Sequence, residues 1–323
     1  MVSVCVLTYN QEAYIGKTLD SILEQDWKVP YEIVIGEDCS TDNTRKVLQT
    51  YKEKYSEVIK LIFRKKNVGS KLNFIETLQA CQGQYIALCE GDDYWTDKNK
   101  ITEQLELFEK NTELSSIHTK VEYVDAENNS LGFSNRVPSD QHVMDLHYLA
   151  QQNTIHTCSF MLKKEVLSPE LYNILMMTPV GDLPLFLISS TYGKVGYINK
   201  SMAAYRKNIG VSGKWSRLKT YENILVVYQA LLDSKAGKVL KRDILVSKRY
   251  QYFMMASVSI HDNKMIDVYK YFLLSLWFSL FLLDYKYDVV HKVSLKKNLK
   301  MSFYLIPGFK GLWSMLKKRL SEK

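Results

Sequence analysis

QYIALCEGDDYW, residues 84–95, starts as a buried β-strand and ends in three carboxylates, Glu90, Asp92 and Asp93. The near-continuous apolar run is typical of a strand covered on both faces, as in a parallel sheet. Carboxylates gathered at a strand end repel one another unless a cation lies among them. Their oxygens suit Mg²⁺ or Mn²⁺, which complete their shells with substrate phosphates. The alternative is a solvated acidic turn that caps the next helix.

Strands and helices alternate through the first hundred residues. Apolar runs predict strands, and each is followed by a segment whose apolar residues recur at helical spacing. Short connections favour right-handed βαβ units, and therefore an α/β protein with a Rossmann-like, mainly parallel sheet. The predicted strands are 2–9, 31–38, 58–63 and 84–89, and the predicted helices cover 12–25, 47–51, 72–80 and 101–108.

Polar residues follow each of these four strands. The ligands of parallel sheets bind beyond the carboxyl ends of the strands. The convergence of four polar clusters on one edge predicts a binding site there more strongly than any single cluster does. The clusters are ThrTyrAsn at 8–10, GluAspCysSerThrAsp at 37–42, ArgLysLysAsn at 64–67 and GluGlyAspAsp at 90–93.

The pattern changes in the second half of the chain. A strand is predicted at 159–162, the start of a helix at 181–187 and a short strand at 192–198. Beyond about residue 213 the sequence becomes helical and aromatic. With 323 residues, 46% of them hydrophobic, the chain can bury a sizeable core. We predict a main domain at 1–213 and a helical, basic, membrane-associating region at 214–323.

The excess basic charge belongs to the C-terminal tail. Residues 286–323 contain ten Lys or Arg against two acidic residues, a net of +8, which equals the formal charge of the whole chain. Residues 1–285 therefore balance, which argues against nucleic-acid binding by the main domain. SFYLIPGFKGLWSMLKKRL at 302–320 mixes aromatic and basic residues, as in segments that lie on anionic membranes. The alternative is an amphipathic helix packed on the main domain.

The uncharged run YFLLSLWFSLFLL at 271–283 is too short to cross a bilayer. As a helix it spans about 20 Å, against a hydrocarbon core of about 30 Å. It predicts a core or interfacial helix. Met1 leads into VSVCVLTYN, which lacks the basic region and cleavage site of a signal peptide. The five cysteines fit no zinc spacing and predict buried, reduced thiols. Together these features predict a cytoplasmic protein, peripheral on the inner face of the plasma membrane.

Four ordered motifs resemble those of the family 2 glycosyltransferases, which have the GT-A fold and transfer a sugar from a nucleotide-diphosphate donor. The resemblance extends over about residues 2–215. It implies a GT-A domain with a C-terminal helical extension, and a place in bacterial surface-polysaccharide synthesis on a glycan or lipid-linked acceptor. The motifs are VSVCVLTYNQEAYIGKTLDSILEQ (2–25), EIVIGEDCSTDNT (32–44), NVGSKLNF (67–74) and YIALCEGDDYW (85–95).

The resemblance implies a nucleotide pocket made from the first strand ends. Thr8, Tyr9 and Glu12 are expected to line the base and ribose, and Asn67 belongs to an Asn-x-Gly donor-binding segment. Asp38 is expected to hydrogen-bond the pyrimidine, because an acceptor-only carboxylate suits the imide N–H of uracil. A helix-capping role is the alternative for Asp38. UDP-sugars are the favoured donors, with dTDP- and GDP-sugars open.

The same resemblance assigns roles to the acidic cluster. Glu90 takes the first acidic position, where a ribose contact is expected, and Asp92 becomes the ligand of Mn²⁺ or Mg²⁺. Gly91 lets the backbone turn tightly and approach the donor. Asp93 is expected to border the sugar. Trp95 either offers a face to a sugar ring or packs in the core.

Transfer to a hydroxyl also needs a general base. GDLPL at 181–185 resembles the segment that supplies it in the family, so Asp182 is the candidate. The resemblance implies inversion by a single displacement. A helix-capping role is the alternative, and both roles can hold, since a helix N-terminus keeps a carboxylate ionised.

MAAYRKNIGVS at 202–212 resembles a later family loop. There a His two residues after the Arg can reach the metal or phosphates, but this chain has Asn208, a weaker metal ligand. Arg206 or Lys207 can neutralise the departing diphosphate, and a solvated cation is the alternative for each.

Three further polar residues are predicted to be structural. Asp42 is expected to cap the second helix rather than bind a ligand. His118 and His156 lack metal-ligand spacing and are predicted to be structural or to lie on the acceptor side.

Two other hypotheses fit the composition. A nucleotide-sugar-forming nucleotidyltransferase would need a Gly-rich basic phosphate loop after the first strand, which LTYNQEAYIGK at 7–17 lacks. A non-catalytic nucleotide- or membrane-binding protein would not need both Asp92 and Asp182.

Overall fold

The computed structural model describes residues 1–134, 143–144, 155–207, 209, 215–262 and 265–281. The chain divides into two compact units. The first contains Met1–Trp215 and Val226–Lys241, and the second contains Ser216–Leu225 and Arg242–Lys323. The domain boundary predicted at residue 213 is close to Trp215, where the first segment of the first unit ends. Part of the predicted helical region nevertheless belongs to the first unit.

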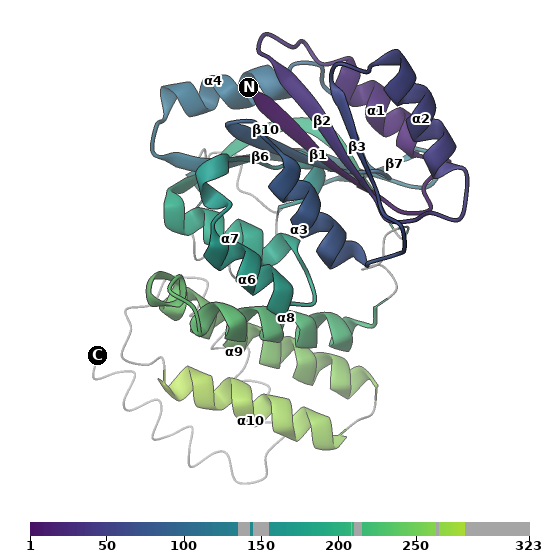
Figure 1. The fold of residues 1–323 in the computed structure, drawn as a ribbon. Coiled ribbons are helices and arrows are strands. Elements are labelled where there is room, and N and C mark those ends of the chain that lie inside the picture. The colour runs from purple at the N-terminus through teal and green to yellow at the C-terminus, as the bar shows by residue number, and fades with distance from the viewer. Residues whose placement is uncertain (135–142, 145–154, 208, 210–214, 263–264, 282–323) are drawn as a thin grey trace, which may run out of the picture. The chain divides into compact units, whose positions relative to one another are not determined.

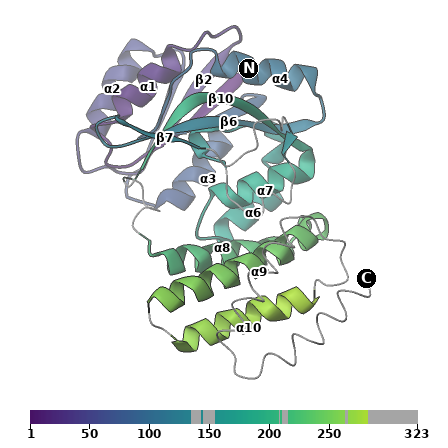
Figure 2. The ribbon, with the colours of Figure 1, turned by 180° about the vertical axis from the view of Figure 1, so that it is seen from behind.

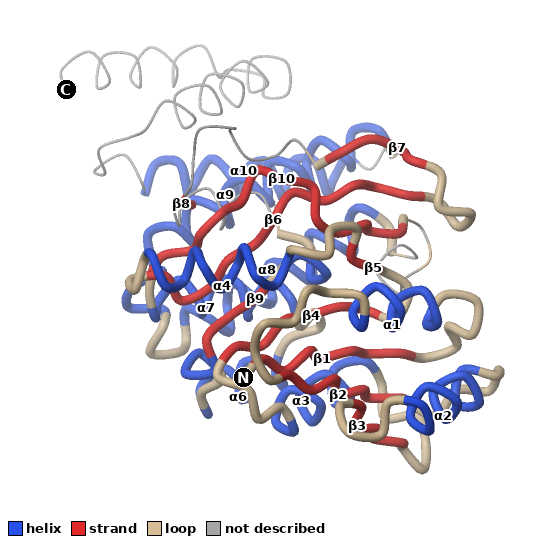
Figure 3. The backbone as a smooth tube through the Cα atoms, turned by 90° about the horizontal axis from the view of Figure 1, so that it is seen from above, coloured by secondary structure: helices blue, strands red, loops and turns tan. Residues whose placement is uncertain are grey.

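The first unit contains a ten-stranded mixed sheet in the order β3-β2-β1-β4-β9-β6-β10-β5, with β7 on β6 and β8 on β10 (Figures 1 and 3). Strands β1 to β4 are mutually parallel, as are β6 and β10, whereas β9 and β5 are antiparallel to their neighbours. The predicted α/β class with a mainly parallel sheet is confirmed. The strands are β1 Val2–Thr8, β2 Tyr31–Glu37, β3 Ile59–Phe63, β4 Tyr85–Glu90, β5 Tyr94–Trp95, β6 Leu114–Val124, β7 Ser130–Phe133, β8 Val143–Met144, β9 Met161–Lys163 and β10 Lys194–Arg206.

Helices cover both faces of this sheet, which explains why its central strands are apolar throughout (Figures 1 and 2). One face carries α1 (Ile15–Leu23), α2 (Thr44–Lys54) and α4 (Lys100–Lys110), and the other carries α3 (Ser70–Ala80), α6 (Pro169–Met177) and α7 (Asp182–Tyr192). Ile15, Leu19 and Ile22 of α1 are fully buried, as their helical spacing predicts. All five cysteines are free; four of them are buried as predicted, whereas Cys39 is half-buried.

Strand β6 was not apparent in the sequence, although it lies inside the sheet. Its inward positions include Ser115, Ser116 and His118, so the buried face is polar and the apolar alternation is lost. The Ser115 hydroxyl donates to the Ser189 carbonyl of α7 at 2.6 Å, and Ser116 and Ser189 hydroxyls are 3.0 Å apart. At Ser115 and Ser116, hydrogen bonds to a neighbouring helix accompany the apolar packing of Leu114, Ile117 and Val121 of the same strand.

Two predicted boundaries were wrong. Strand β10 continues to Arg206, beyond the predicted end at residue 198, and includes residues 202–206 that were assigned to a loop. The strand predicted at 159–162 is present as β9, but it starts later, at Met161, because Thr157–Ser159 forms a short 3₁₀ helix; a second such turn spans Lys164–Val166.

The C-terminal part is helical, as predicted, with α8 (Arg217–Leu232), α9 (Gly237–His261) and α10 (Met265–Phe281). The apolar core of the second unit is formed by Met255, Ala256, Tyr271 and Phe272. No helix in the described part of the chain combines the length and apolarity needed to span a membrane. Asn208 and the basic tail at 286–323, with its segment 302–320, lie outside the described residues.

Candidate active site

The loops after β1 and β4 meet at the carboxyl edge of the sheet. Strand β1 lies between β2 and β4 and is parallel to both, with Thr8 opposite Glu37 and Leu7 opposite Glu90. The helix that follows β1 covers one face, and the helix that precedes β4 covers the other (Figure 1). The connections therefore diverge between β1 and β4, and parallel α/β sheets bind ligands at such a point.

Gly91 sets the close approach of these two loops. Its N–H donates to the Leu7 carbonyl at 2.8 Å. A Cβ added at Gly91 would lie 2.5 Å from Gln11 Oε1 and 2.9 Å from Thr8 Oγ1. Within the described structure, Thr8 Oγ1, Gln11 Oε1 and Glu90 Oε2 are buried and have no hydrogen-bond partner. Buried polar atoms without partners are costly, so their concentration here indicates a site for a polar ligand.

The three carboxylates of the β4 loop are held in a state that resists ionisation. Burial, with the neighbouring charges of Asp92 and Asp182, raises the pKa of Glu90 to about 8. Burial also raises the pKa of Asp92, against the opposing effects of the Arg206 charge and a hydrogen bond from Gln11. The pKa of Asp93 rises because of burial and because Asp92 and Glu90 lie nearby. A cation bound here would lower all three values, so the cluster fits a cationic or cation-bridged ligand.

A metal ion bound at this site would take part of its coordination shell from the phosphates of the enzyme's substrate. Among the described residues, no group of three or more His, Cys, Asp or Glu side chains is arranged to hold one. Asp92, only 6% exposed, offers a single carboxylate beside the unpaired oxygens of Thr8 and Glu90. Mg²⁺ and similar hard cations are commonly held by one or two carboxylates together with substrate phosphates and water. The residues present fit that arrangement.

Arg206, at the end of β10, is 3% exposed, so the predicted alternative of a solvated cation is wrong. Its guanidinium lies 4.5 Å from the centre of the Tyr14 ring. Its side chain donates four hydrogen bonds, which favours a positioning role over direct contact with a diphosphate. The acceptors are the carbonyls of Asp92 (2.8 Å), Asp125 (2.7 Å) and Ala126 (3.0 Å) and the side chain of Asn128 (2.8 Å).

Asp182 belongs to the same site. It is the first residue of α7, after the N-cap Gly181, and its carboxylate accepts the N–H of Leu183 at 2.8 Å. A Cβ at Gly181 would lie 2.8 Å from the Phe74 ring of α3, so this helix start requires glycine. The charge of Asp182 acts on Glu90, as does that of Asp92. The Asp182 carboxylate is therefore within electrostatic range of Glu90.

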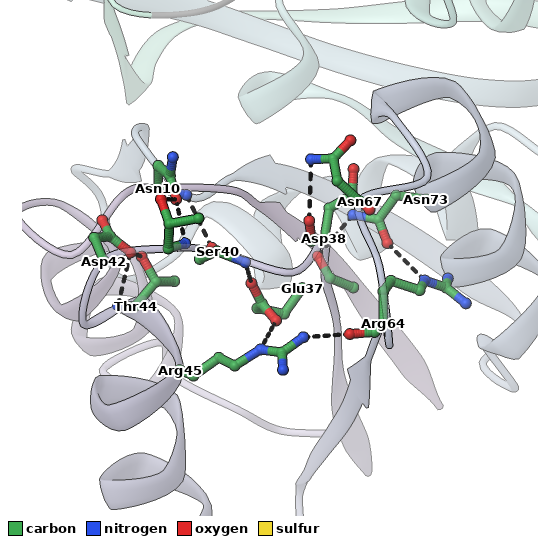
Figure 4. A network of polar contacts seen from close by, with 12 residues as sticks. Asn10, Glu37, Asp38, Ser40, Asp42, Thr44, Arg45, Arg64, Asn67 and Asn73 are labelled. Atoms are coloured by element: carbon green, nitrogen blue, oxygen red, sulfur yellow. Dashed lines mark hydrogen bonds and ion pairs between the residues drawn. The ribbon is translucent and has the colours of Figure 1, made fainter.

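Asp38 and Asn67 form a second polar centre at the same edge (Figure 4). The Asp38 carboxylate accepts the N–H groups of Val68 at 2.7 Å and Gly69 at 2.9 Å. The Asn67 amide donates to the Asp38 carbonyl at 3.1 Å. Gly69 has φ +86°, a conformation that favours glycine. Asp38 thus holds the Asn67–Gly69 loop in place instead of capping a helix.

Of the residues around the end of β1, Thr8 and Tyr9 lie at the candidate site, whereas Glu12 supports the start of α2. Tyr9 is 43% exposed and accessible to a ligand, whereas Thr8 is buried beside Gly91. Glu12 contributes to the start of α2, because its carboxylate accepts the Asn43 N–H at 2.7 Å and its own N–H donates to Asp42 at 3.0 Å. Asp42 also accepts the N–H of the first residue of α2, Thr44, at 2.9 Å, as predicted for a cap.

A buried ion pair that the sequence did not suggest supports this edge (Figure 4). Arg45 of α2 pairs with Glu37, whose side chain has no exposed surface, and donates to the Arg64 carbonyl. Arg64 in turn donates to Asn73 at 3.2 Å and pairs with Glu76. The ends of β2 and β3 and the starts of α2 and α3 are thereby joined around Asp38.

Trp95 packs in the core, so its predicted alternative as a sugar-binding surface is not favoured. It is 4% exposed, and its indole N–H donates to the Cys158 carbonyl at 2.9 Å. The ammonium of buried Lys100 lies 4.3 Å from the centre of its ring. Burial lowers the pKa of Lys100 to about 8. One ring face is thus occupied by a protein cation.

His118 and His156 lie among aromatic rings. His118 is 1% exposed, stacks at 4.9 Å on Tyr197, and within the described residues has no hydrogen-bond partner for either ring nitrogen. Burial lowers its pKa to about 3. His156 packs edge-on against Tyr205 at 4.9 Å and Tyr123 at 5.3 Å. The structural role predicted for His118 agrees with this burial.

Half-buried Tyr205 adjoins the acidic cluster, a position that the sequence did not reveal. Burial, followed by the charges of Asp93 and Glu90, raises its pKa. Tyr205 also packs edge-on against Tyr123, and the Lys207 ammonium lies 3.7 Å from the centre of the Tyr123 ring. Aromatic and basic side chains therefore border the carboxylates.

Comparison with known families decides the class of this site. A family model described as "Glycosyl transferase family 2" matches residues 3–168. The chain belongs to this family. That segment contains Thr8, Asp38 and the complete acidic cluster, whereas Asp182 and Arg206 follow it.

Curated relatives agree with the assignment. "Uncharacterized protein Mb1547" of Mycobacterium bovis is 31% identical over 246 residues, which cover 73% of this chain and 69% of the relative. "Putative teichuronic acid biosynthesis glycosyltransferase TuaG" of Bacillus subtilis is 40% identical over 106 residues, 33% of this chain and 41% of the relative. This chain is therefore a glycosyltransferase related to enzymes of bacterial surface-polysaccharide synthesis.

Solved structures identify the fold as GT-A. The structure of S. aureus TarS 1–349 in complex with UDP-GlcNAc has a TM-score of 0.63 at 16% identity and covers 85% of this chain and 81% of that chain. The mannosyltransferase PcManGT of Pyrobaculum calidifontis, in complex with GDP-Man and Mn²⁺, has a TM-score of 0.53 at 15% identity, over 97% and 83% of the two chains. At these identities the likeness establishes the fold alone.

Proposed function

We propose that this glycosyltransferase transfers a sugar from a nucleotide-diphosphate donor, with inversion, to a hydroxyl of a glycan or lipid-linked acceptor in bacterial surface-polysaccharide synthesis. The observation that carries the proposal is that buried oxygens of Thr8, Gln11 and Glu90 without a described partner gather where the loops after β1 and β4 meet, within range of the charges of Asp92 and Asp182. A metal-binding carboxylate and a general base must serve one sugar, and this arrangement supports that requirement. UDP-sugars are the favoured donors, because the TarS structure contains UDP-GlcNAc and Asp38 suits a pyrimidine.

The donor would be held across the two polar centres. Asp38 keeps acceptor capacity on its carboxylate for the base, and the loop that begins at Asn67 is fixed around it. Tyr9 offers an exposed ring beside the base and ribose. Thr8 and Glu90 supply the unpaired buried oxygens for ribose hydroxyls.

Asp92 would hold Mn²⁺ or Mg²⁺, which would neutralise the charge that develops on the departing diphosphate. Gly91 lets the β4 loop pack closely on Thr8 and Gln11, which positions the neighbouring Asp92. Asp93 borders the sugar. Lys207, close to the half-buried aromatic group, is the more suitable diphosphate contact, because Arg206 already has four partners.

Asp182 would accept the proton of the acceptor hydroxyl as its oxygen attacks the anomeric carbon. The bond to the donor phosphate breaks in the same displacement, which inverts the anomeric centre. The N-terminus of α7 stabilises the carboxylate form of Asp182 and so keeps it ready to accept a proton. We further propose that the protein works at the inner face of the plasma membrane, which the basic tail at 286–323 contacts.

The test compares Asp182→Asn with the unchanged chain in a panel of nucleotide-sugars with Mn²⁺ and an acceptor-containing membrane extract. The variant should retain thermal stabilisation by UDP but lose transfer by about 10²-fold or more. Asp97→Asn is the matched control, because Asp97 is a half-buried carboxylate whose partner is the surface residue Lys200. Normal transfer by Asp182→Asn would refute its role as the base.

A further inference from the structure

Helix α10 exposes an apolar stripe. The spacing of its members, i, i+3, i+7 and i+11, places them on one helical face. On the other side of the helix, Tyr271 and Phe272 pack with Met255 and Ala256 in the core of the second unit. The helix is therefore apolar both toward its core and toward solvent. The α10 stripe consists of Ile266, Tyr269, Leu273 and Trp277, which are 86%, 40%, 53% and 57% exposed.

The exposed charge described beside the α10 stripe is basic, whereas the one acidic residue of this helix, Asp267, is half-buried. Lys270 is exposed and falls on the same helical face. None of the exposed residues described in α10 is acidic. The chain beyond residue 285 adds ten basic residues against two acidic ones. Aliphatic, Tyr and Trp side chains with basic neighbours characterise helices that lie in the headgroup region of anionic bilayers.

The small extent of the α10 stripe favours a lipid surface over a second protein as its binding partner. A stable protein interface takes about 800 Å² and 20–30 residues on each side. Among the α10 side chains that the structure describes, the stripe offers four apolar ones, fewer than a stable dimer needs. Among the described helices none can cross a membrane. An interfacial helix needs only one apolar face, sunk about 5–10 Å into the headgroup boundary.

We propose that the α10 stripe is a docking surface for an anionic lipid membrane. Leu273 and Trp277 enter the boundary between headgroups and acyl chains, and Lys270 meets the lipid phosphates. This surface extends the membrane contact proposed for the tail to a defined helix face. It does not depend on the transfer chemistry.

The test is co-sedimentation of the full chain with phosphatidylglycerol–phosphatidylcholine vesicles and with phosphatidylcholine vesicles alone. The double variant Leu273→Ser, Trp277→Ser should lower the partition coefficient on the anionic vesicles by about tenfold or more. Lys270→Glu should lower anionic binding and leave neutral binding unchanged. Met177→Ser and Val239→Ser are matched controls, because these apolar residues are 60% and 62% exposed but lie outside the stripe.

Thermal stabilisation by UDP with Mn²⁺, measured on every variant, reports on the donor site separately. Loss of vesicle binding with donor stabilisation intact supports the docking surface whether or not the proposed transfer is correct. Unchanged partition of the double variant overturns the proposal. A lowered melting temperature with unchanged partition shows that another part of the chain covers the stripe. A shift from dimer to monomer in sedimentation velocity, again with unchanged partition, assigns the stripe to a second copy; both outcomes also overturn the proposal.

Discussion

Asp93 and Arg206 join the loop after β4 to the end of β10, 113 residues later: the Arg206 backbone N–H donates to the Asp93 carboxylate at 2.8 Å. The Arg206 side chain also holds the Asp92 carbonyl at 2.8 Å. The proposed metal ligand lies between Gly91, fixed on β1, and Asp93, fixed on β10. Its position therefore depends on both halves of the sheet.

Arg206→Ala should destabilise the protein by about 2–4 kcal/mol, because the carbonyls of Asp92, Asp125 and Ala126 lose a charged donor. Urea denaturation measures this change. Lys207→Ala should change the free energy of unfolding by less than about 1 kcal/mol, since Lys207 is half-buried and its ammonium contacts a ring rather than buried carboxylates. Equal effects of the two substitutions would contradict the positioning role of Arg206.

Asp38→Ala should release the Asn67–Gly69 loop, because the N–H groups of Val68 and Gly69 lose their acceptor. We expect a loss of about 2–3 kcal/mol in stability and at least tenfold weaker UDP binding, measured by urea denaturation and calorimetry. Asp38→Asn keeps one oxygen acceptor and should recover part of the stability. If UDP binds Asp38→Ala normally, the base lies elsewhere.

Asp92→Asn should remove the dependence of UDP binding on Mn²⁺, because the neutral amide is a poor ligand for a hard cation. Calorimetric titration of UDP with and without Mn²⁺ checks this. The control Asp97→Asn should bind as the unchanged protein does. A Mn²⁺ effect that survives in Asp92→Asn would place the metal on another residue.

Gly91→Ala and Gly16→Ala form a matched pair. The added methyl at Gly91 would collide with Gln11 and Thr8, whereas at Gly16 in α1 it would meet only the Tyr51 hydroxyl at 3.5 Å. We expect the first change to cost about 1–3 kcal/mol and to weaken donor binding. The second should be neutral or stabilising by about 0.5–1 kcal/mol, as for other helical positions. Thermal melts with and without UDP distinguish these outcomes.

Buried His118 should make the protein less stable in acid. Its folded pKa of about 3 lies below the usual value of 6.5, so between these values the unfolded chain binds a proton that the folded chain does not. The contribution of His118 to the free energy of unfolding should therefore fall as pH falls from about 6.5 toward 3, by about 1.4 kcal/mol per unit. Glu90, whose folded pKa of about 8 lies above its usual value of 4.5, contributes in the opposite direction between these values, so the His118 contribution is measured as the difference between the unchanged protein and a His118 variant. His118→Phe, which keeps a ring against Tyr197, should reduce this slope. An unchanged slope in urea denaturation at pH 4 to 7 would contradict the assignment.

The sequence predicted those parts of the fold that depend on apolar periodicity. Strands β1 to β4 and helix α1 followed from runs such as VSVCVLTY at 2–9, because their buried faces are apolar. Strand β6 was not predicted from the sequence, because Ser116 and His118 are buried but polar. Periodicity detects burial only where the buried residues are apolar.

The site was partly predictable because strand ends of a parallel sheet share one edge. That rule brought together Thr8, Asp38 and the acidic cluster. It could not assign Arg206, because its partners are mainly backbone carbonyls that no side-chain pattern reveals. It also could not separate the two alternatives for Trp95, since an indole at a strand end can face either the core or a ligand.

The order of the strands has a consequence for synthesis on the ribosome. Of the described strands, β10 is made last, yet it pairs with both β6 and β5. A nascent chain that has emerged only as far as residue 168 already contains β1 to β4, but its β5 and β6 lack this partner and Asp92 lacks Arg206. The growing polypeptide would thus contain the strand ends of the proposed donor site early. The loop that carries Asp92 would be fixed only after residue 206 has left the exit tunnel.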